Sequence, residues 1–254
     1  MQGNEYEKYR LQSVEKSINI LNLFYDAEEL GAAEVAAKMG MTRGTAFRFL
    51  TTLEMNGLLI RTSKARYRLG LQLYSLGQLA YARFSLPDLS HPYLARLMEA
   101  TGETTFLGIS DGSTKVIYVD RVVSTSTLRI DIRLGTRITA HHTSIGKSIL
   151  AYQSEKFIQH YLETTDFTPI TQRTISDAKM LLLELEQIRH TGYSCDDEES
   201  ETGLVCFGAP ILDRTGQSIA GISVSGPRSR MLENKKEILI SLQDTARAIS
   251  SKVI

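Results

Sequence analysis

Ser144 and Lys147 lie three residues apart in the segment Ser144-Ile-Gly-Lys147, and this spacing is typical of two different chemistries. In serine-lysine acyl-transfer enzymes, the lysine activates a serine hydroxyl at this spacing. Those enzymes also contain the motifs Ser-Asp-Asn and Lys-Thr-Gly, and neither motif occurs in this sequence. A helix that begins at Ser144 would instead present the backbone N–H groups of Ser144, Ile145 and Gly146 to a small anion at the positive end of the helix dipole. We expect the anion site, and the acyl-transfer enzyme is the alternative.

Histidine, cysteine and aspartate side chains near this segment are candidate metal ligands. They are His141, His142, Cys195, Asp196 and Cys206. Adjacent residues of an extended segment point to opposite faces, so the two histidines are not expected to share an ion, and the cysteines lack Cys-x-x-Cys spacing. The nucleotide-binding glycine motifs GxGxxG and GxxxxGK[ST] also do not occur between an expected strand and an expected helix. We expect neither a metal nor a cofactor.

The elements that could serve a macromolecular partner lie earlier, where residues 32–57 have the pattern of two short helices joined by a turn. Val35, Ala36 and Met39 are apolar at helical spacing, Gly40 suits a left-handed turn, and Thr42 is a good N-cap for the second helix. The apolar stripe of that second helix comprises Ala46, Phe49, Leu50 and Leu53. Its open side begins with Thr42, Arg43, Thr45 and Arg48. This pattern predicts a helix-turn-helix.

A hairpin and a local excess of positive charge follow the helix pair. Strands are expected at 58–61 and 66–69, around the polar turn 62–65. The chain as a whole is neutral, with 29 basic and 29 acidic residues, yet between Met41 and Gly70 the only acid is Glu54. The basic residues there are Arg43, Arg48, Arg61, Lys64, Arg66 and Arg68. A helix pair, a wing and segregated charge together predict binding to double-stranded operator DNA. The expected contacts are Thr42, Arg43, Thr45, Ala46, Arg48, Lys64 and Arg66.

Apolar helices flank this winged helix-turn-helix on both sides. In the first, residues 11–25, the stripe Val14, Ile18, Leu21 and Phe24 is expected to complete the small core. The second, residues 71–84, carries Leu73, Leu76 and Leu79 and stops before Pro87. We interpret it as a linker helix that buries its apolar side in a homo-oligomer, a dimer or a tetramer. The alternative is that it only completes the core of the small domain.

From residue 87 the pattern predicts an α+β domain with an antiparallel sheet, because strands in hairpin succession are flanked by helices. The expected strands are 103–109, 116–122, 128–134, 193–197, 204–212 and 218–225. The expected helices are 92–101, 144–152, 154–163, 177–190 and 234–253. The domain organisation is therefore 1–70, the DNA-binding domain; 71–86, the linker helix; and 87–254, a ligand-binding domain.

Composition adds limits on location. The first residues are polar and contain no apolar run typical of a signal peptide, and no stretch approaches the ~20 apolar residues of a membrane span. The two cysteines are too few for a disulfide framework. We expect a cytoplasmic protein with free thiols and no membrane partner.

Short motifs occur in order along essentially the whole chain. They are Gln12-Ser-Val-Glu-Lys-Ser17, Thr45-Ala-Phe-Arg-Phe-Leu-Thr-Thr-Leu53, Tyr67-Arg-Leu-Gly70, Thr101-Gly-Glu-Thr104, Asp120-Arg121, His142-Thr-Ser-Ile-Gly-Lys147, Thr174-Ile175, Gly192-Tyr193, Asp196-Asp-Glu-Glu199, Gly203-Leu-Val-Cys206, Ala209-Pro210 and Gly221-Ile-Ser-Val-Ser-Gly-Pro227. Together they resemble the isocitrate lyase regulator (IclR) family of bacterial transcription factors. Gly44 departs from the serine common in the family, which removes a phosphate contact and lowers helix propensity by about 1 kcal/mol.

The resemblance implies a winged helix-turn-helix, a linker helix and a C-terminal effector-binding domain of GAF-like fold. It implies a transcription regulator, with repression the expected sign, and not an enzyme. The family's effector site falls on Ser144, Ile145, Gly146, Asp196, Cys206, Ser223 and Ser225. Ser223 and Ser225 lie two apart on an expected strand, so both hydroxyls share a face. We expect these residues to bind a small carboxylate such as a keto or sugar acid.

Overall fold

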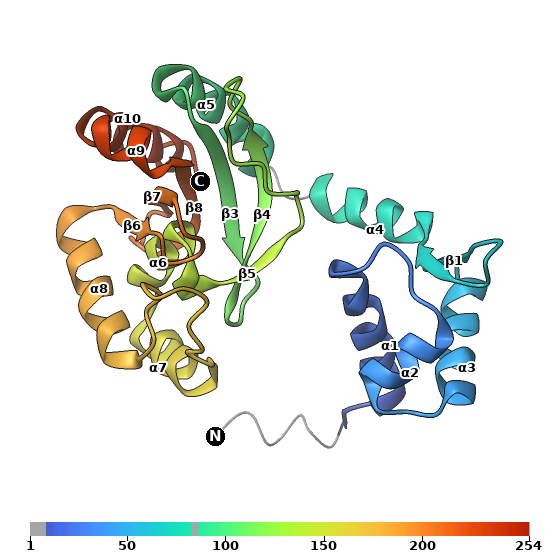
Figure 1. The fold of residues 1–254 in the computed structure, drawn as a ribbon. Helices are drawn as coiled ribbons and strands as arrows, with labels where there is room; N and C mark the ends of the chain where they lie inside the picture. Colours follow the sequence, from blue (N-terminus) through green and yellow to red (C-terminus); the bar gives the residue numbers. More distant parts are fainter. Residues whose placement is uncertain (1–8, 83–85, 254) are drawn as a thin grey trace. The chain divides into compact units, whose positions relative to one another are not determined.

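The computed structural model describes residues 9–82 and 86–253, and the chain divides into two compact units. The first unit is Met1–Phe84 and the second is Ser85–Ile254 (Figure 1). The end of the expected linker helix, residues 83 and 84, lies outside the described residues. No helix within the described ranges is long and apolar enough to cross a membrane.

The N-terminal unit is a winged helix-turn-helix followed by one more helix. Its elements are α1 (Gln12–Asn22), the 3-10 helix η2 (Leu23–Tyr25), α2 (Ala32–Met39), α3 (Arg43–Met55), β1 (Leu59–Arg61), β2 (Tyr67–Leu69) and α4 (Leu71–Ala82). Gly40 ends α2 at φ 60°, and the Thr42 hydroxyl caps α3 by accepting a hydrogen bond from the Thr45 N–H at 3.2 Å. The turn and the cap are as the sequence predicts, and they set the angle at which α3 leaves α2.

The core of this unit holds α3 in place through its apolar stripe. Ala46, Leu50 and Leu53 are buried together with Ile20 of α1 and Tyr67 of the wing. The expected stripe on α1 is wrong in part, because Val14 and Ile18 are exposed while Ile20 is fully buried. α1 therefore leaves apolar side chains on the surface of the unit.

The C-terminal unit is built on one six-stranded antiparallel sheet, as expected for an α+β fold. Its strands are β3 (Thr104–Ser110), β4 (Lys115–Val122), β5 (Arg137–Thr139), β6 (Ser194–Asp197), β7 (Leu204–Leu212) and β8 (Ser218–Pro227), in the order β5-β4-β3-β8-β7-β6. The helices are α5 (Leu86–Thr101), the 3-10 helix η3 (Ala140–His142), α6 (Ser144–Ala151), α7 (Glu155–Thr164), α8 (Ala178–Thr191), α9 (Arg228–Glu233) and α10 (Lys235–Ser250).

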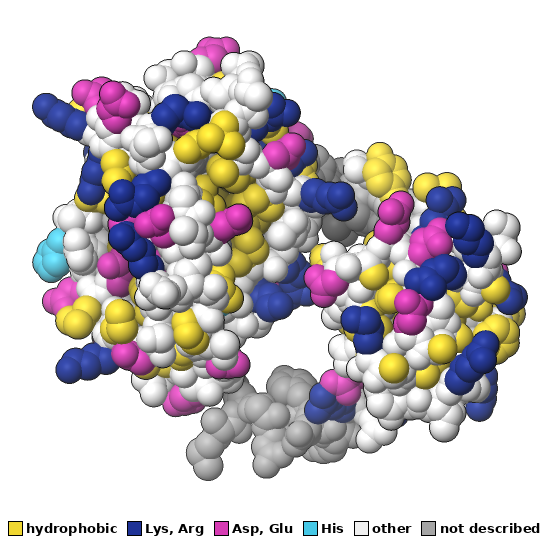
Figure 2. Space-filling model, in the orientation of Figure 1, with side chains coloured by type: hydrophobic (Ala, Val, Ile, Leu, Met, Phe, Trp, Pro, Cys, Tyr) yellow, Lys and Arg dark blue, Asp and Glu magenta, His cyan; other side chains and the backbone are white. Residues whose placement is uncertain are grey.

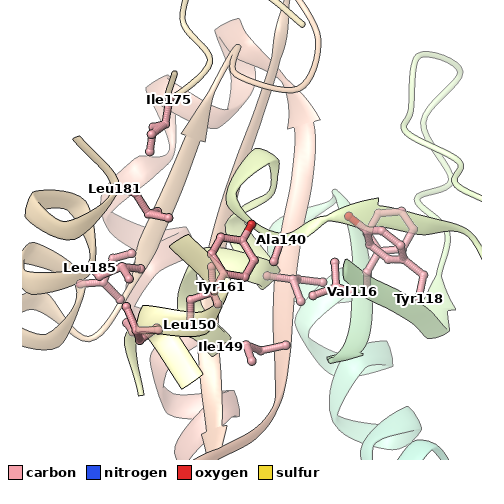
Figure 3. Packing of buried hydrophobic residues seen from close by; sticks show 14 residues of the cluster. Val116, Tyr118, Ala140, Ile149, Leu150, Tyr161, Ile175, Leu181 and Leu185 are labelled. Carbon is pink, nitrogen blue, oxygen red and sulfur yellow. The ribbon is translucent and has the colours of Figure 1, made fainter. Parts of the chain in front are cut away.

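Helix α6 packs on one face of the sheet, over β3, β8 and β7. Three glycines allow this close approach, because a Cβ at Gly108, Gly208 or Gly221 would lie 2.8 Å or less from an atom of α6. The α6 side of the sheet carries a buried hydrophobic cluster, in which Val116 and Tyr118 of β4 join Ile149 and Leu150 of α6 (Figure 3). Helices α5 and α10 also pack on the sheet, and the Thr105 hydroxyl donates to the Leu94 carbonyl of α5 at 3.0 Å.

Two expected elements of this unit are wrong. Residues 128–134 form no strand, because side chains take up their carbonyl groups: Arg230 donates to the Leu128 oxygen and Arg121 to the Ile132 oxygen. The third strand is instead β5. Helix α5 begins at Leu86 and not at residue 92, since Leu86, Ser90 and Leu94 lie on one buried side. The expected last helix is confirmed as α10, which begins at Lys235 and ends at Ser250, and the short helix α9 before it was not predicted.

Candidate DNA-binding surface and effector site

The open side of α3 carries most of the expected DNA-contacting side chains. Arg43, Thr45 and Arg48 are exposed, as is Lys64 in the turn of the wing. The Thr42 hydroxyl is also at the surface, but it is engaged in capping. Figure 2 shows basic side chains spread over this unit, with hydrophobic side chains between them.

Two of the residues expected to contact DNA have structural roles within the N-terminal unit instead. Ala46 is 0% exposed in the core stripe, so its side chain cannot meet a DNA base. Arg66 reaches back to α2, where its Nη2 lies 2.8 Å from Glu34 Oε2, and the same Nη2 donates to the carbonyl of Glu29, which precedes α2, at 2.9 Å. This arginine fastens the wing to α2, and its charge is paired. Ala46 was expected both in the apolar stripe and among the DNA contacts, and only the first is right. The partners of Arg66 are 32 and 37 residues away in the chain, so residue spacing could not reveal them.

The arginines of α3 line two different hollows. Arg43 faces a groove of about 660 Å³ that it shares with Arg61 and Lys64 of the wing. Arg48 faces a second groove of about 440 Å³, between α3 and α1, with Ser13 and Ser17. The open face of α3 therefore has cationic side chains on both flanks. This arrangement suits a helix that lies in a DNA groove between two phosphate backbones.

The expected effector residues of the sheet come together on the face that α6 covers. Strand register places Asp196, Cys206 and Ser225 side by side across β6, β7 and β8, and Ser223 next to Gly208. Cross-strand neighbours share a face of the sheet. A Cβ at Gly208 would lie 2.6 Å from the Ser144 carbonyl oxygen, which shows that this face meets the start of α6. The two serine hydroxyls are 3.3 Å apart and buried.

The start of α6 differs from the expectation at one amide. The Gly146 N–H is taken by the Thr143 hydroxyl, which caps the helix at 3.0 Å. A glycine is required at position 146 by the close approach of η3, since a Cβ there would lie 2.1 Å from the Ala140 carbonyl oxygen. The first-turn amides of Ser144 and Ile145 have no partner within the helix itself and remain suited to an anion.

Tyr118 joins this group and was not found from the sequence. It lies opposite Gly108 on β4, on the face of the sheet that α6 covers, and it is hydrogen-bonded to the Thr143 side chain. Its ring meets the Phe106 ring edge to face at 5.3 Å. Burial raises the pKa of Tyr118, so its hydroxyl stays protonated. A tyrosine in an alternating strand is normally core, and only the sheet register shows that it reaches the site.

Asp196 is held by the loop that follows it. Its Oδ1 accepts from the Glu199 N–H at 2.7 Å and its Oδ2 from the Ser200 hydroxyl at 2.5 Å. Burial raises the pKa of Asp196, and these hydrogen bonds oppose the rise. Burial also raises the pKa of the neighbouring Cys206 thiol well above its usual range, which keeps the thiol protonated. The sheet side of the site thus offers hydroxyl and thiol groups together with one carboxyl.

Lys147 is 0% exposed and its ammonium lies in a cage of acceptors. Nζ donates to Glu199 Oε1 and to the Cys195 carbonyl, both at 2.5 Å, and to Glu184 Oε1 at 3.3 Å. Burial would lower the pKa of Lys147, but Glu199 and Glu184 outweigh it and the pKa is raised. Burial raises the pKa of Glu199 to about 7, against the opposing effect of Lys147. This pair ties α6 to the loop after Asp196.

The candidate metal ligands are not brought together. Within the described ranges, no three His, Cys, Asp or Glu side chains are placed to hold a metal ion. Cys195 pairs with Phe207 and Asp196 with Cys206, so the two cysteines lie on opposite faces of the sheet. His141 accepts or donates at Nδ1 to the Tyr161 hydroxyl at 2.8 Å, and burial lowers its pKa to about 4. The histidines are part of the core beside α6.

Both units match models of one family. The IclR helix-turn-helix domain matches residues 13–63, and the bacterial transcriptional regulator IclR C-terminal domain matches residues 78–251. The chain therefore belongs to the IclR family of bacterial transcriptional regulators, which have a DNA-binding domain and an effector-binding domain.

Individual relatives agree with this class over nearly the whole chain. The transcriptional regulator KdgR of Escherichia coli is 33% identical over 245 residues, which are 96% of this chain and 93% of KdgR. The transcriptional repressor AllR of E. coli is 30% identical over 243 residues, 94% of this chain and 89% of AllR. The crystal structure of the Thermotoga maritima IclR is 34% identical, with a TM-score of 0.71, and covers 96% of this chain and 99% of that one.

Proposed function

We propose that this chain is a repressor that binds operator DNA through α3 and the wing and is controlled by a small carboxylate, a keto or sugar acid, bound at the start of α6. The observation that carries the proposal is the row of Asp196, Cys206 and Ser225, with Ser223 beside it, facing the first turn of α6. Repression is supported by AllR, a relative that is named a repressor.

The chemistry of the site favours a ligand with both a carboxylate and hydroxyl or keto groups. The amides of Ser144 and Ile145 suit the carboxylate, because they lie at the positive end of the α6 dipole. The hydroxyls of Ser223 and Ser225 can donate to a keto oxygen, and the Asp196 carboxyl can accept from a ligand hydroxyl. Lys147 is not part of this recognition, because its three N–H donors already have acceptors.

Replacing both Ser223 and Ser225 by Ala tests the effector site. A bound ligand at about 100 times its dissociation constant stabilises the fold by about 2.7 kcal/mol. A thermal-shift screen over keto acids, hydroxy acids and sugar acids should therefore find a stabilising compound for the unaltered protein. We expect the double variant to lose that shift and to keep operator binding without ligand. Cys206→Ser is the matched control and should change the affinity less, since a thiol is a weak hydrogen-bond partner. A full ligand response in the double variant would place the effector elsewhere.

We also propose that α4 is a linker helix whose apolar side lies in a homodimer or homotetramer, between a DNA-binding domain 1–70 and an effector domain from residue 87. Leu71, Tyr74, Leu76 and Leu79 are all exposed within a helix of 12 residues. Exposed apolar surface of this extent is typical of an interface. Effector binding would then favour one relative placement of the DNA-binding domains across the oligomer.

The variant Leu76→Asp tests this role of α4. Leu76 is 50% exposed in the single chain, so the change should leave the fold of the chain intact. A carboxylate buried in a subunit interface is strongly unfavourable, and we expect the oligomer to dissociate. Light scattering measures the mass, and Arg214→Asp in the β7–β8 turn serves as the charge control. An unchanged oligomer would show that α4 lies outside the interface.

The acyl-transfer alternative is disfavoured by the state of Lys147. Its ammonium is held protonated between Glu199 and Glu184, so it cannot take a proton from Ser144. The relatives in hand are transcription regulators, in agreement with a binding role for Ser144. A burst assay with an activated ester checks this directly. We expect no burst, and a stoichiometric burst lost in Ser144→Ala would contradict the proposal.

A further inference from the structure

Phe47 is a large apolar residue exposed on the open side of α3, and the sequence pattern did not account for it. It is 43% exposed, one turn after Arg43 and three residues after Gly44. It is not among the residues of the small core or those packed against it, whereas Phe49, two residues on, is. Packing therefore does not explain why an aromatic ring stands at this position.

The surroundings of Phe47 are those of a DNA-contacting surface. It lies in the groove whose lining includes Arg43, Arg61 and Lys64, and the one acid of that lining, Glu34, is paired with Arg66. The Arg61 guanidinium lies 5.9 Å from the centre of the Phe47 ring. A Cβ at Gly44 would meet no described atom within 4 Å, so the helix surface beside the ring is bare. An apolar ring flanked by cations and by a residue without a side chain is open to a base edge.

We propose that Phe47 contacts the C5 methyl group of a thymine in the major groove and so specifies that base. The first residues of a recognition helix are those that reach base edges, and Phe47 is the fifth residue of α3. The thymine methyl is the one apolar group in the major-groove pattern, and phenylalanine is among the side chains that recognise it. Arg61 and Lys64 contact the adjacent phosphates. The inference rests on operator binding by α3.

Deoxyuridine, which lacks only the C5 methyl group, tests the contact. The preferred duplex is selected from a random library with the full chain, and each thymine is then replaced singly by deoxyuridine. Fluorescence anisotropy gives the Kd for the unaltered protein, Phe47→Ala and Met55→Ala. Met55 is the control, since it is an 82% exposed apolar residue at the far end of α3.

We expect one thymine or more at which deoxyuridine weakens binding by the unaltered protein about fourfold, the factor for burying one methyl-sized group. Phe47→Ala should bind both duplexes equally, and Met55→Ala should keep the fourfold ratio. If Phe47→Ala does not fold, Phe47→Gln, which keeps a side chain of comparable length, replaces it.

Two results would overturn the role of Phe47. One is that no deoxyuridine substitution weakens DNA binding by the unaltered protein. The other is that the fourfold ratio of the two Kd values persists in Phe47→Ala. If Phe47→Ala weakens binding to both duplexes by the same factor, the fourfold ratio persists, and the ring then only supports Arg61. If the selection returns no preferred sequence, sequence-specific operator binding fails and the role of Phe47 fails with it. A preferred sequence without methyl dependence overturns the role of Phe47 alone.

Discussion

Lys147→Met is expected to destabilise the effector domain by roughly 3–5 kcal/mol at pH 8, because removal of one partner leaves a buried charge uncompensated. Lys147 is fully buried, and the Glu199 side chain is only 11% exposed. Methionine fills a similar volume, so the loss reflects charge and hydrogen bonding more than a cavity. Chemical denaturation of the full chain, followed by a probe in the C-terminal unit, measures the change.

The cost of Lys147→Met should depend on pH in a defined direction. Burial raises the pKa of Glu199 from its ordinary value of 4.5 to about 7. The folded protein therefore favours the protonated form of Glu199. This contribution to stability is complete below about pH 4.5 and is lost as the pH rises through about 7. Without Lys147, which holds that pKa down, the pKa rises further. The difference in unfolding free energy between the two proteins should therefore grow between pH 5 and pH 8.

A second substitution provides the control for Lys147→Met. In the double variant Lys147→Met with Glu199→Gln, the pair is replaced by neutral groups, and we expect most of the lost stability to return. The pH dependence between pH 5 and pH 8 should flatten as well. Equal stability of Lys147→Met and the unaltered protein at pH 8 would show that the ion pair does not hold α6 to the loop after Asp196.

Arg43→Ala combined with Arg48→Ala is expected to weaken operator binding strongly. A base-reading arginine is worth roughly 1–3 kcal/mol, and a phosphate-binding one lowers the salt dependence of the affinity. Both side chains are exposed, so the fold should be unaffected. Anisotropy with operator and random duplexes at two salt concentrations separates the two roles.

The matched control is Arg214→Ala, which removes the same charge from the exposed turn between β7 and β8. It should leave both affinities unchanged. Of the two single variants, we expect Arg43→Ala to reduce the salt dependence of the DNA affinity, since Arg43 shares its groove with Arg61 and Lys64. Wild-type affinity for the operator in the double variant, at matched salt, would contradict the placement of α3 in the DNA groove.

The sequence predicted the elements that local rules control. The turn at Gly40, the cap at Thr42 and most strands of the sheet depend on residues near each other in the chain, and these predictions are confirmed. The strand at 128–134 failed because its carbonyl groups bind Arg121 and Arg230, which come from other elements. Alternation of apolar residues reports burial, and Ile130 and Ile132 do pack on the core, but it does not report which groups satisfy the backbone.

For the functional residues, the chain by itself determined the class of protein and the helix that carries the exposed arginines, and it predicted the segments of the proposed effector site. Those follow from ordered motifs, helical spacing and the period of a strand. Only the tertiary structure decided which side chains are available. It buries Ala46, pairs Arg66 with Glu34, gives the Gly146 amide to Thr143, and brings Tyr118 to the site. The physical reason is that charge pairing, capping and cross-strand register join residues far apart in the chain, and periodicity contains no information about such partners.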